Sequence, residues 1–278
     1  FNEVCRSKVL EDVSEWKRVM HRFGRWADME NAYRTMDRDF MESVWWVFKE
    51  LWDKGLIYES YRIMHICPRC ETTLSQSEVA EGYKDVKDLS AVAKFEILTH
   101  NSQLTTHNEK TYILAWTTTP WTLPGNVALA VGEDIEYVKV RQFAEISIDD
   151  SPRPEGRPST GEYFLIVSKT FFEEKLKDDE WCLKMNLDFS FEEISSFKGS
   201  ELVGKAYKPL FDCYSKDEKL QNRENGWKIY AAEFVNTEEG TGVVHIAPAF
   251  GEDDMALGKK ANLPFVQHVN RDGTIRSE

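Results

Sequence analysis

The hydrophobic pattern of the chain changes its period at Gly55, and this change constrains the fold more than any other feature. Before Gly55, apolar residues recur every three or four positions, which predicts amphipathic helices; one is expected over residues 39–54, with Gly55 ending it. After Gly55, short runs of β-forming residues alternate with turn residues, which is typical of strands. The sequence therefore predicts an α+β fold, in which an N-terminal helical part precedes a β-barrel-like domain with added helices.

The two helical stripes are expected to be buried, because aromatic stripes at this spacing are most often core packing. They comprise Val9, Val13, Trp16, Met20 and Phe23, and then Phe40, Val44, Val47, Phe48 and Leu51. Strands are expected over residues 57–66, 92–97, 112–117, 127–131, 137–140, 163–167, 228–235 and 242–246, and further helices over 169–177 and 253–261. The stretch "DDSPRPEGRPSTGE", residues 149–162, is rich in Pro, Gly and charge and is predicted to be a solvated loop.

Composition narrows the class of protein. A chain of 278 residues with 41% hydrophobic content can form one or two domains. Its formal net charge of -13 argues against nucleic-acid binding over the whole surface, but it leaves room for a local groove. No apolar run or secretory signal is found, and five cysteines form no disulfide framework, so we expect no membrane span and a cytoplasmic location. The opening "FNEVCRSK" lacks a methionine, which indicates a fragment of a longer polypeptide.

The motif "CPRC" gives Cys67 and Cys70 the spacing of half a zinc knuckle. A closed structural site needs four ligands, and His65 would still leave it one short. The other cysteines are isolated: Cys5, Cys182 and Cys213. We therefore expect a half-site whose partner pair lies outside this chain, and no redox role, because no thioredoxin-like βαβ pattern surrounds the motif.

The stretch "GTGVVHIAPAFGEDD" predicts a short strand, a proline turn and a helix start. Asp253 suits the first turn of that helix, where carboxylates are favoured. A histidine at a strand end, here His245, is more often a hydrogen-bonded core residue than a ligand. However, one tight turn could bring it and an acid into one pocket, where the carboxylate would bind an ammonium group.

The stretch "WTTTPWTLPGN" places three threonines at the end of an expected strand. Strand side chains alternate, so Thr117 and Thr119 should lie on one face and Thr118 on the other. The β-propensity of threonine accounts for part of this pattern without any function. Pro120 then bends the chain into a loop that carries Trp121. These residues predict a polar-lined loop, and no nucleophile elbow, P-loop or H-E-x-x-H motif accompanies it.

Taken together, these stretches resemble the editing domain of class I isoleucyl-tRNA synthetases, an insertion called connective peptide 1. Residues 24–58 are similar to the helical stem of that family, and "CPRCETTLSQSEVAEGYKDV" is similar to its zinc-knuckle region. The related valine and leucine enzymes carry an arginine after the threonines, whereas here Thr119 precedes Pro120 and Trp121, the isoleucine-type form. The family's two ATP-binding signatures do not occur, so this chain is not expected to activate amino acids.

The resemblance implies hydrolysis of mischarged valyl-tRNA(Ile), with valyl-adenylate as a second ligand. Asp254 would bind the substrate's α-ammonium group, and His245 would contact the terminal ribose and exclude the isoleucine side chain. The hydroxyls that line the pocket and orient the attacking water would come from Thr117, Thr118 and Thr119. The remaining substrate-binding candidates are Trp116, Trp121, Asn126 and Asp253.

The resemblance also implies partners and an organisation. The partners would be the 3′ acceptor end of tRNA(Ile) and the remaining synthetase domains, with the fragment itself monomeric. No cofactor is implied for editing, and a structural zinc would belong to the full-length enzyme. The expected parts are a helical stem with connecting strands over 1–66, a half zinc-knuckle with linker over 67–90, and an editing domain over 91–278. Two alternatives stay open: a valine- or leucine-type editing domain that clears another amino acid, or a non-catalytic module that binds the acceptor end.

Overall fold

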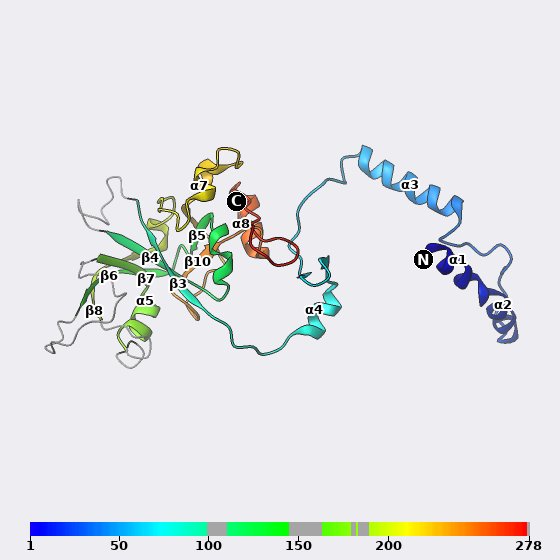
Figure 1. Cartoon of the computed structure of the whole chain (residues 1–278), viewed down its shortest axis with the longest axis horizontal. Helices are drawn as coiled ribbons and strands as arrows, with labels where there is room; N and C mark the ends of the chain where they lie inside the picture. The colour runs from blue at the N-terminus through cyan, green and yellow to red at the C-terminus, as the bar shows by residue number, and fades with distance from the viewer. Residues whose placement is uncertain (99–109, 145–162, 179–181, 183–188, 277–278) are drawn as a thin grey trace. The chain divides into compact units, whose positions relative to one another are not determined.

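The computed structural model describes residues 1–98, 110–144, 163–178, 182 and 189–276 (Figure 1). The chain divides into two compact units, Phe1–Tyr61 and Arg62–Glu278. The expected loop over residues 149–162 lies outside the described residues. None of the helices in the described ranges is both long and apolar enough to span a bilayer.

The first unit consists of α1 (Asn2–Glu11), α2 (Val13–Arg22) and α3 (Arg38–Asp53). The helix expected over 39–54 is confirmed as α3. It ends as predicted, because Gly55 adopts a φ of 68° and its N–H donates to Trp52 O at 2.8 Å. The next N–H, of Leu56, donates to Leu51 O at 3.0 Å, so the last carbonyls of α3 are satisfied.

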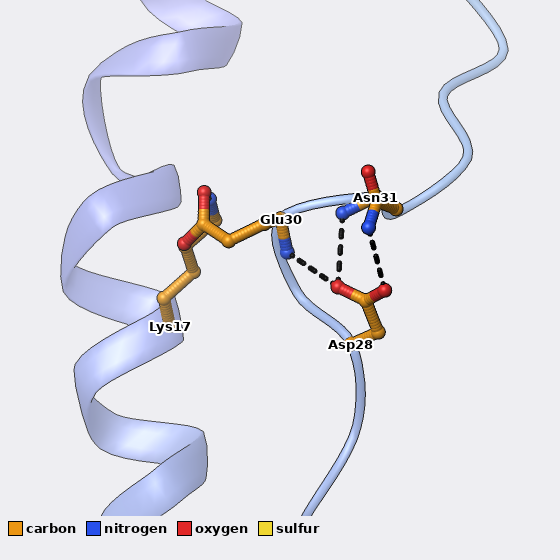
Figure 2. A network of polar contacts seen from close by, with 4 residues as sticks. All are labelled: Lys17, Asp28, Glu30 and Asn31. Atoms are coloured by element: carbon orange, nitrogen blue, oxygen red, sulfur yellow. Dashed lines mark hydrogen bonds and ion pairs between the residues drawn. The ribbon is translucent and has the colours of Figure 1, made fainter.

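A polar turn follows α2 in the same unit (Figure 2). The carboxylate of Asp28 accepts the backbone N–H groups of Glu30 and Asn31 at 3.2 and 3.1 Å and the Asn31 side-chain amide at 2.7 Å. These hydrogen bonds, the Asn31 side-chain bond foremost, lower the pKa of Asp28. Lys17 Nζ on α2 reaches Glu30 Oε2 at 2.9 Å, so the turn is held against the helix that precedes it.

The predicted burial of the two helical stripes is wrong for this unit. No residue of α2 or α3 is buried, and Trp16 and Phe48 are 61% and 45% exposed. A stripe is buried only where another element covers it, and within Phe1–Tyr61 no described element covers these faces. Helical periodicity thus predicted the helices correctly but not their environment.

The second unit is strand-rich, as expected. Its largest sheet has the order β3-β4-β7-β6-β8, and a three-stranded sheet has the order β10-β5-β9. The larger sheet contains β3 (Ala91–Glu96), β4 (Thr111–Thr117), β6 (Glu136–Ala144), β7 (Tyr163–Ser168) and β8 (Phe189–Lys198). The smaller contains β5 (Ala128–Val131), β9 (Lys228–Ala231) and β10 (Val243–Ile246), and a separate hairpin pairs β1 (Ile66–Cys67) with β2 (Thr72–Thr73). The α+β class is confirmed, and among the described strands the sheets are open rather than closed into a barrel.

Short helices decorate this unit. They are α4 (Gln76–Gly82), η1 (Pro120–Gly125), α5 (Lys169–Phe171), η2 (Phe172–Leu176), η3 (Gly199–Glu201), α7 (Cys213–Lys216), η4 (Arg223–Asn225) and α8 (Glu252–Lys260). The helices expected over 169–177 and 253–261 correspond to the α5–η2 pair and to α8. Within η2 the chain forms a single π-turn rather than regular α-helix.

Three strand predictions need correction. Residues 57–65 are not a strand, since within the expected run over 57–66 only Ile66 finds a strand partner, and β1 then continues to Cys67. Strand β6 continues to Ala144 rather than ending at residue 140, because it pairs with both β7 and β8. Strand β9 ends at Ala231, where its pairing with β5 ends. Two further strands, β2 and β8, were not predicted.

The segment 240–242 ties the two sheets together beside the carboxyl end of β4. Thr241 Oγ1 donates to Leu114 O at 2.6 Å, and Thr241 O accepts the Ser168 N–H at 2.9 Å. Gly242 O accepts the buried Tyr137 hydroxyl at 2.6 Å. Strand β10 therefore begins at a fixed position next to β4, and the residues that follow both strands meet.

Candidate active site

A cavity of about 360 Å³ opens where β4 and β10 end. Its lining comes from the end of β4, from η1, from the segment before and along β10, and from the start of α8. The lining residues from the predicted set are Trp116, Thr117, Thr118, Thr119, Trp121, His245 and Asp254. Residues far apart in the sequence thus converge on one cavity, which is enclosed by both polar and aromatic side chains.

The threonines form a chain of hydroxyls along one wall. Thr117 and Thr119 lie on the same face, as predicted, with their Oγ1 atoms 3.3 Å apart, and the Thr119 N–H donates to Thr117 Oγ1 at 3.1 Å. Thr119 Oγ1 lies 3.3 Å from Thr122 Oγ1. Thr117 and Thr122 are buried, whereas Thr118 is exposed. Among the three consecutive threonines, Thr118 is therefore the most exposed residue.

Thr122 joins this hydroxyl chain to His245. Its Oγ1 donates to Thr119 O at 2.7 Å and lies 2.9 Å from His245 Nε2. A hydroxyl has one proton, so with that proton on Thr119 O it accepts from His245, and the imidazole carries its proton on Nε2. His245 Nδ1 is buried without a partner among the described residues. The ring is therefore held in one tautomer, with an acceptor nitrogen still unused.

Burial also determines the charge of His245. Desolvation lowers its pKa from 6.5 to about 4, because the imidazolium would lose water without gaining a counter-charge. The ring is therefore neutral at pH 7. The ring can present its surface and the lone pair of Nδ1 to a ligand, but it does not supply a positive charge.

This depressed pKa predicts a pH-dependent stability. Between pH 4 and 6.5 the unfolded chain binds a proton at His245 that the folded chain resists, so stability falls as the pH falls through this window. From pH 7 to pH 5 the free energy of unfolding should fall by about 2 kcal/mol more in the wild type than in His245→Gln. Urea unfolding of both chains at the two pH values measures this, and parallel pH profiles would contradict it.

Asp254 lies in the first turn of α8 with its carboxylate directed toward the loop after β10. Its Oδ2 accepts the Ala247 N–H at 2.9 Å, so the other oxygen is the one available to a ligand. Burial raises the pKa of Asp254, the Ala247 N–H opposes this rise, and the neighbouring Asp253 adds to it. A cationic ligand group would offset the desolvation of this carboxylate, which makes Asp254 suited to bind an ammonium group.

Aromatic side chains also contribute to the lining. Trp121 contacts Phe250 edge-on, with ring centroids 5.5 Å apart and an interplanar angle of 86°. Trp116 packs over Gly240, where a Cβ atom would lie 2.9 Å from the indole ring. Gly240 also has a φ of 74°, so a larger residue there would both strain the backbone and displace the tryptophan.

Two predicted binding residues lie outside the cavity lining. Asn126 is buried, and its amide donates to Ala128 O at 2.8 Å and accepts the Tyr207 hydroxyl at 2.6 Å. Asp253 is exposed in the first turn of α8, which is the position at a helix start that was predicted for it. Asn126 therefore holds the chain after η1 through these hydrogen bonds, and neither residue is among the described lining residues.

Other lining residues were missed by sequence reasoning. Thr122, Phe250 and Glu239 line the cavity, yet none carried a signal of its own. Strand β4 ends at Thr117 and η1 begins at Pro120, so strand alternation could not show that the η1 turn brings Thr122 back to the same wall. Only the helical turn of η1 reveals this contact.

The Cys67–Cys70 turn brings two thiols together between β1 and β2. The backbone N–H groups of Cys70 and Arg69 lower the pKa of the Cys67 thiol, which favours the thiolate that a metal requires. Within the described part of the chain, no third His, Cys, Asp or Glu joins the two thiols, His65 included. The donors present thus fit half of a tetrahedral zinc site.

Comparisons with known proteins place the chain among tRNA synthetases. Residues 1–239 match the profile of the family described as tRNA synthetases class I (I, L, M and V). An isoleucine–tRNA ligase of Clostridium acetobutylicum is 41% identical over 278 residues, covering 100% of this chain and 23% of the relative. One from Treponema denticola is 42% identical over 286 residues, covering 97% of this chain and 24% of that protein. The chain thus spans about a quarter of the length of these relatives.

Solved structures give weaker similarity. The crystal structure of GlLeuRS-CP1 aligns with a TM-score of 0.41 and 17% identity, covering 62% of this chain and 60% of that one. The editing domain of the P. knowlesi cytosolic leucyl-tRNA synthetase aligns with a TM-score of 0.40 and 16% identity, covering 61% of this chain and 62% of that one.

Proposed function

The chain belongs to the tRNA synthetases of class I (I, L, M and V), and from this premise we propose that its cavity hydrolyses the ester bond of mischarged valyl-tRNA(Ile). The observation that carries the proposal is the convergence of the threonine hydroxyls, His245 and Asp254 on one cavity. The resemblance to isoleucine-type editing domains and about 40% identity to isoleucine–tRNA ligases support the choice of amino acid.

In this proposal the cavity would select its substrate by charge and by side-chain size. The valyl ester carries a free α-ammonium group, which the available oxygen of Asp254 would bind. His245 would contact the terminal ribose and leave no room for the additional methylene of isoleucine. Sensing one methylene is worth about 1–3 kcal/mol in a pocket, a figure for which this synthetase family is itself the standard example.

The reaction requires a positioned water and no enzyme nucleophile. An aminoacyl ester is already activated, so holding a water close to its carbonyl carbon can supply much of the acceleration. The hydroxyls of Thr118 and Thr119 would orient this water, with Thr117 and Thr122 holding Thr119 in place. His245 does not act as an imidazolium in this scheme, because burial keeps its ring neutral at pH 7.

The charge of the cavity favours the ester over the adenylate. None of the described lining residues is Lys or Arg, whereas Asp254 and Glu239 contribute carboxylates. An aminoacyl adenylate carries a phosphate that these acids would repel. Valyl-adenylate is therefore the second candidate ligand.

The rest of the longer protein would supply what this chain lacks. We propose that the 3′ end of tRNA(Ile) enters the cavity from the exposed Trp121 side and that other synthetase domains hold the remainder of the tRNA. With a net charge of -13, the isolated chain should bind tRNA weakly. Cys67 and Cys70 would complete a structural zinc site with ligands from outside this chain.

Amino-acid release from charged tRNA tests the proposal. The chain should release valine from Val-tRNA(Ile) and spare Ile-tRNA(Ile). Preferential release of threonine would favour a valine-type editing domain instead. Binding of the acceptor end without release of any amino acid would favour a non-catalytic module.

The His245→Ala variant tests how isoleucine is excluded. Removing the ring enlarges the pocket, so release of isoleucine should rise at least about tenfold relative to valine. The measurement is the ratio of the two initial deacylation rates. A variant that still spares Ile-tRNA(Ile) would show that His245 does not exclude the larger side chain.

A further inference from the structure

His268 is a buried histidine that the proposed reaction does not use. It lies outside the cavity lining and is 1% exposed. Its Nε2 lies 2.9 Å from Trp121 O, and because a carbonyl only accepts, Nε2 carries the proton. Its Nδ1 is buried without a partner among the described residues. One ring nitrogen thus makes a single directed contact, and that contact is to the backbone of a cavity residue.

The same ring also contacts the second aromatic wall. Its centroid lies 4.9 Å from that of Phe250, at an interplanar angle of 65°. Phe250 in turn meets Trp121 edge-on. His268, Trp121 and Phe250 therefore form a closed set of three contacts, with His268 behind the wall that the other two present to the cavity.

This arrangement leaves little freedom to the imidazole. Gly125, at the end of η1, lies so close that a Cβ atom there would be 2.8 Å from His268 Nδ1. On its other side the backbone is fixed, because His268 O accepts the Arg276 N–H at 2.9 Å and Val269 bridges to Ile275. The ring is thus a rigid support.

Trp121 needs such a support. It is 49% exposed, so burial alone does not fix its position. Trp121 lies within η1, and beyond that turn the hydrogen bond from His268 fixes its carbonyl and the edge contact with Phe250 fixes its ring. A shift of this wall would change the width of the cavity.

We propose that His268 is a positioning residue that holds Trp121 and Phe250 at the cavity wall and so sets the size of the side chain that the cavity admits. The kinetic part of this inference rests on the proposed function. The structural part concerns the position of Trp121 and stands independently of any activity.

Two substitutions at His268 separate the effect of its hydrogen bond from the effect of its ring volume. His268→Phe keeps a ring of similar size but loses the donor to Trp121 O. His268→Gln places an amide donor close to the position of Nε2. Tyr230→Phe is the matched control, because it also removes a side-chain donor to a backbone carbonyl, Asn225 O at 2.6 Å, away from the cavity lining.

The position of Trp121 is measured by fluorine NMR on chains labelled with fluorotryptophan, with its resonance assigned by Trp121→Phe. The His268→Phe variant should shift this resonance, whereas His268→Gln and Tyr230→Phe should leave it close to the wild-type position. In deacylation assays, His268→Phe should lower the preference for valine over isoleucine about tenfold, mainly through KM, and His268→Gln should restore it.

An unshifted Trp121 resonance in His268→Phe, or an equal shift in Tyr230→Phe, would overturn the proposal. If the wild type releases no amino acid, the proposed function fails while the resonance still decides the role of His268. If His268→Phe does not fold, Gly125→Ala displaces the same ring from the opposite side. Its Trp121 resonance should then shift, and an unchanged one would again overturn the proposal.

Discussion

Replacing Asp254 with asparagine should lower kcat/KM for Val-tRNA(Ile) about 100-fold, the typical cost of removing one partner of a buried charge pair. Asparagine keeps the size of the side chain, and its amide oxygen can still accept the Ala247 N–H that holds Asp254 Oδ2 at 2.9 Å. Only the negative charge that would bind the α-ammonium group is lost. The loss should fall mainly on KM, because the ammonium is bound in both the ground and the transition state.

The neighbouring residue provides the control. Asp253 is on the same turn of α8 but is exposed and outside the cavity lining. Asp253→Asn removes the same charge one position away, so its deacylation rate should stay within about twofold of the wild type. Equal losses in the two variants would indicate a general effect of acidic charge, and an unchanged rate in Asp254→Asn would refute the ammonium site.

Replacing Gly242 with alanine should lower the free energy of unfolding by about 3 kcal/mol, the sum of a backbone and a steric term. Gly242 has a φ of 74°, and a Cβ atom there would lie 2.5 Å from Ser168 Cβ. Ser168 cannot move away easily, because it is fully buried and its N–H donates to Thr241 O at 2.9 Å. The clash therefore acts on the segment that fixes the start of β10.

Gly204 separates the two terms. Its φ of 83° is equally left-handed, but no heavy atom lies within 4 Å of the Cβ position. Gly204→Ala should therefore cost only the backbone term, about 1 kcal/mol. Urea unfolding of both variants measures the difference, and equal losses would show that the contact with Ser168 has no cost.

Local sequence patterns predicted most of the elements around the cavity. The β-forming run that became β4 and the apolar run that became β5 were identifiable because their neighbours along the chain favour the same conformation. Strand β8 was missed because its sequence, "FSFEEISSFK", mixes serines and glutamates with the apolar residues, and its conformation depends on pairing with β6. The run over 57–65 was assigned wrongly for the opposite reason, since its residues favour strands but find no partner.

Burial, too, could be predicted where it depends on the local backbone but not where it depends on a packing partner. The stripes of α2 and α3 have the spacing of core-facing helices, yet Trp16 and Phe48 remain exposed because no described element of their unit covers them. The prediction that Thr117 and Thr118 lie on opposite faces agrees with the structure, where Thr117 is buried and Thr118 is exposed, because strand alternation is a property of the backbone itself.

By itself the sequence determined the chemistry available: three threonines with alternating faces, a histidine at a strand end, and an acid at the start of a helix. The tertiary structure alone decided which of these side chains meet. Thr122 and His245 are 123 positions apart and come within 2.9 Å only because β10 pairs with β5 and begins at a fixed glycine turn. In the same packing, Asn126 lies outside the cavity lining, and His268 lies behind the wall formed by Trp121 and Phe250. Contacts of this kind depend on long-range strand pairing, whose energy comes from partners that no local pattern contains.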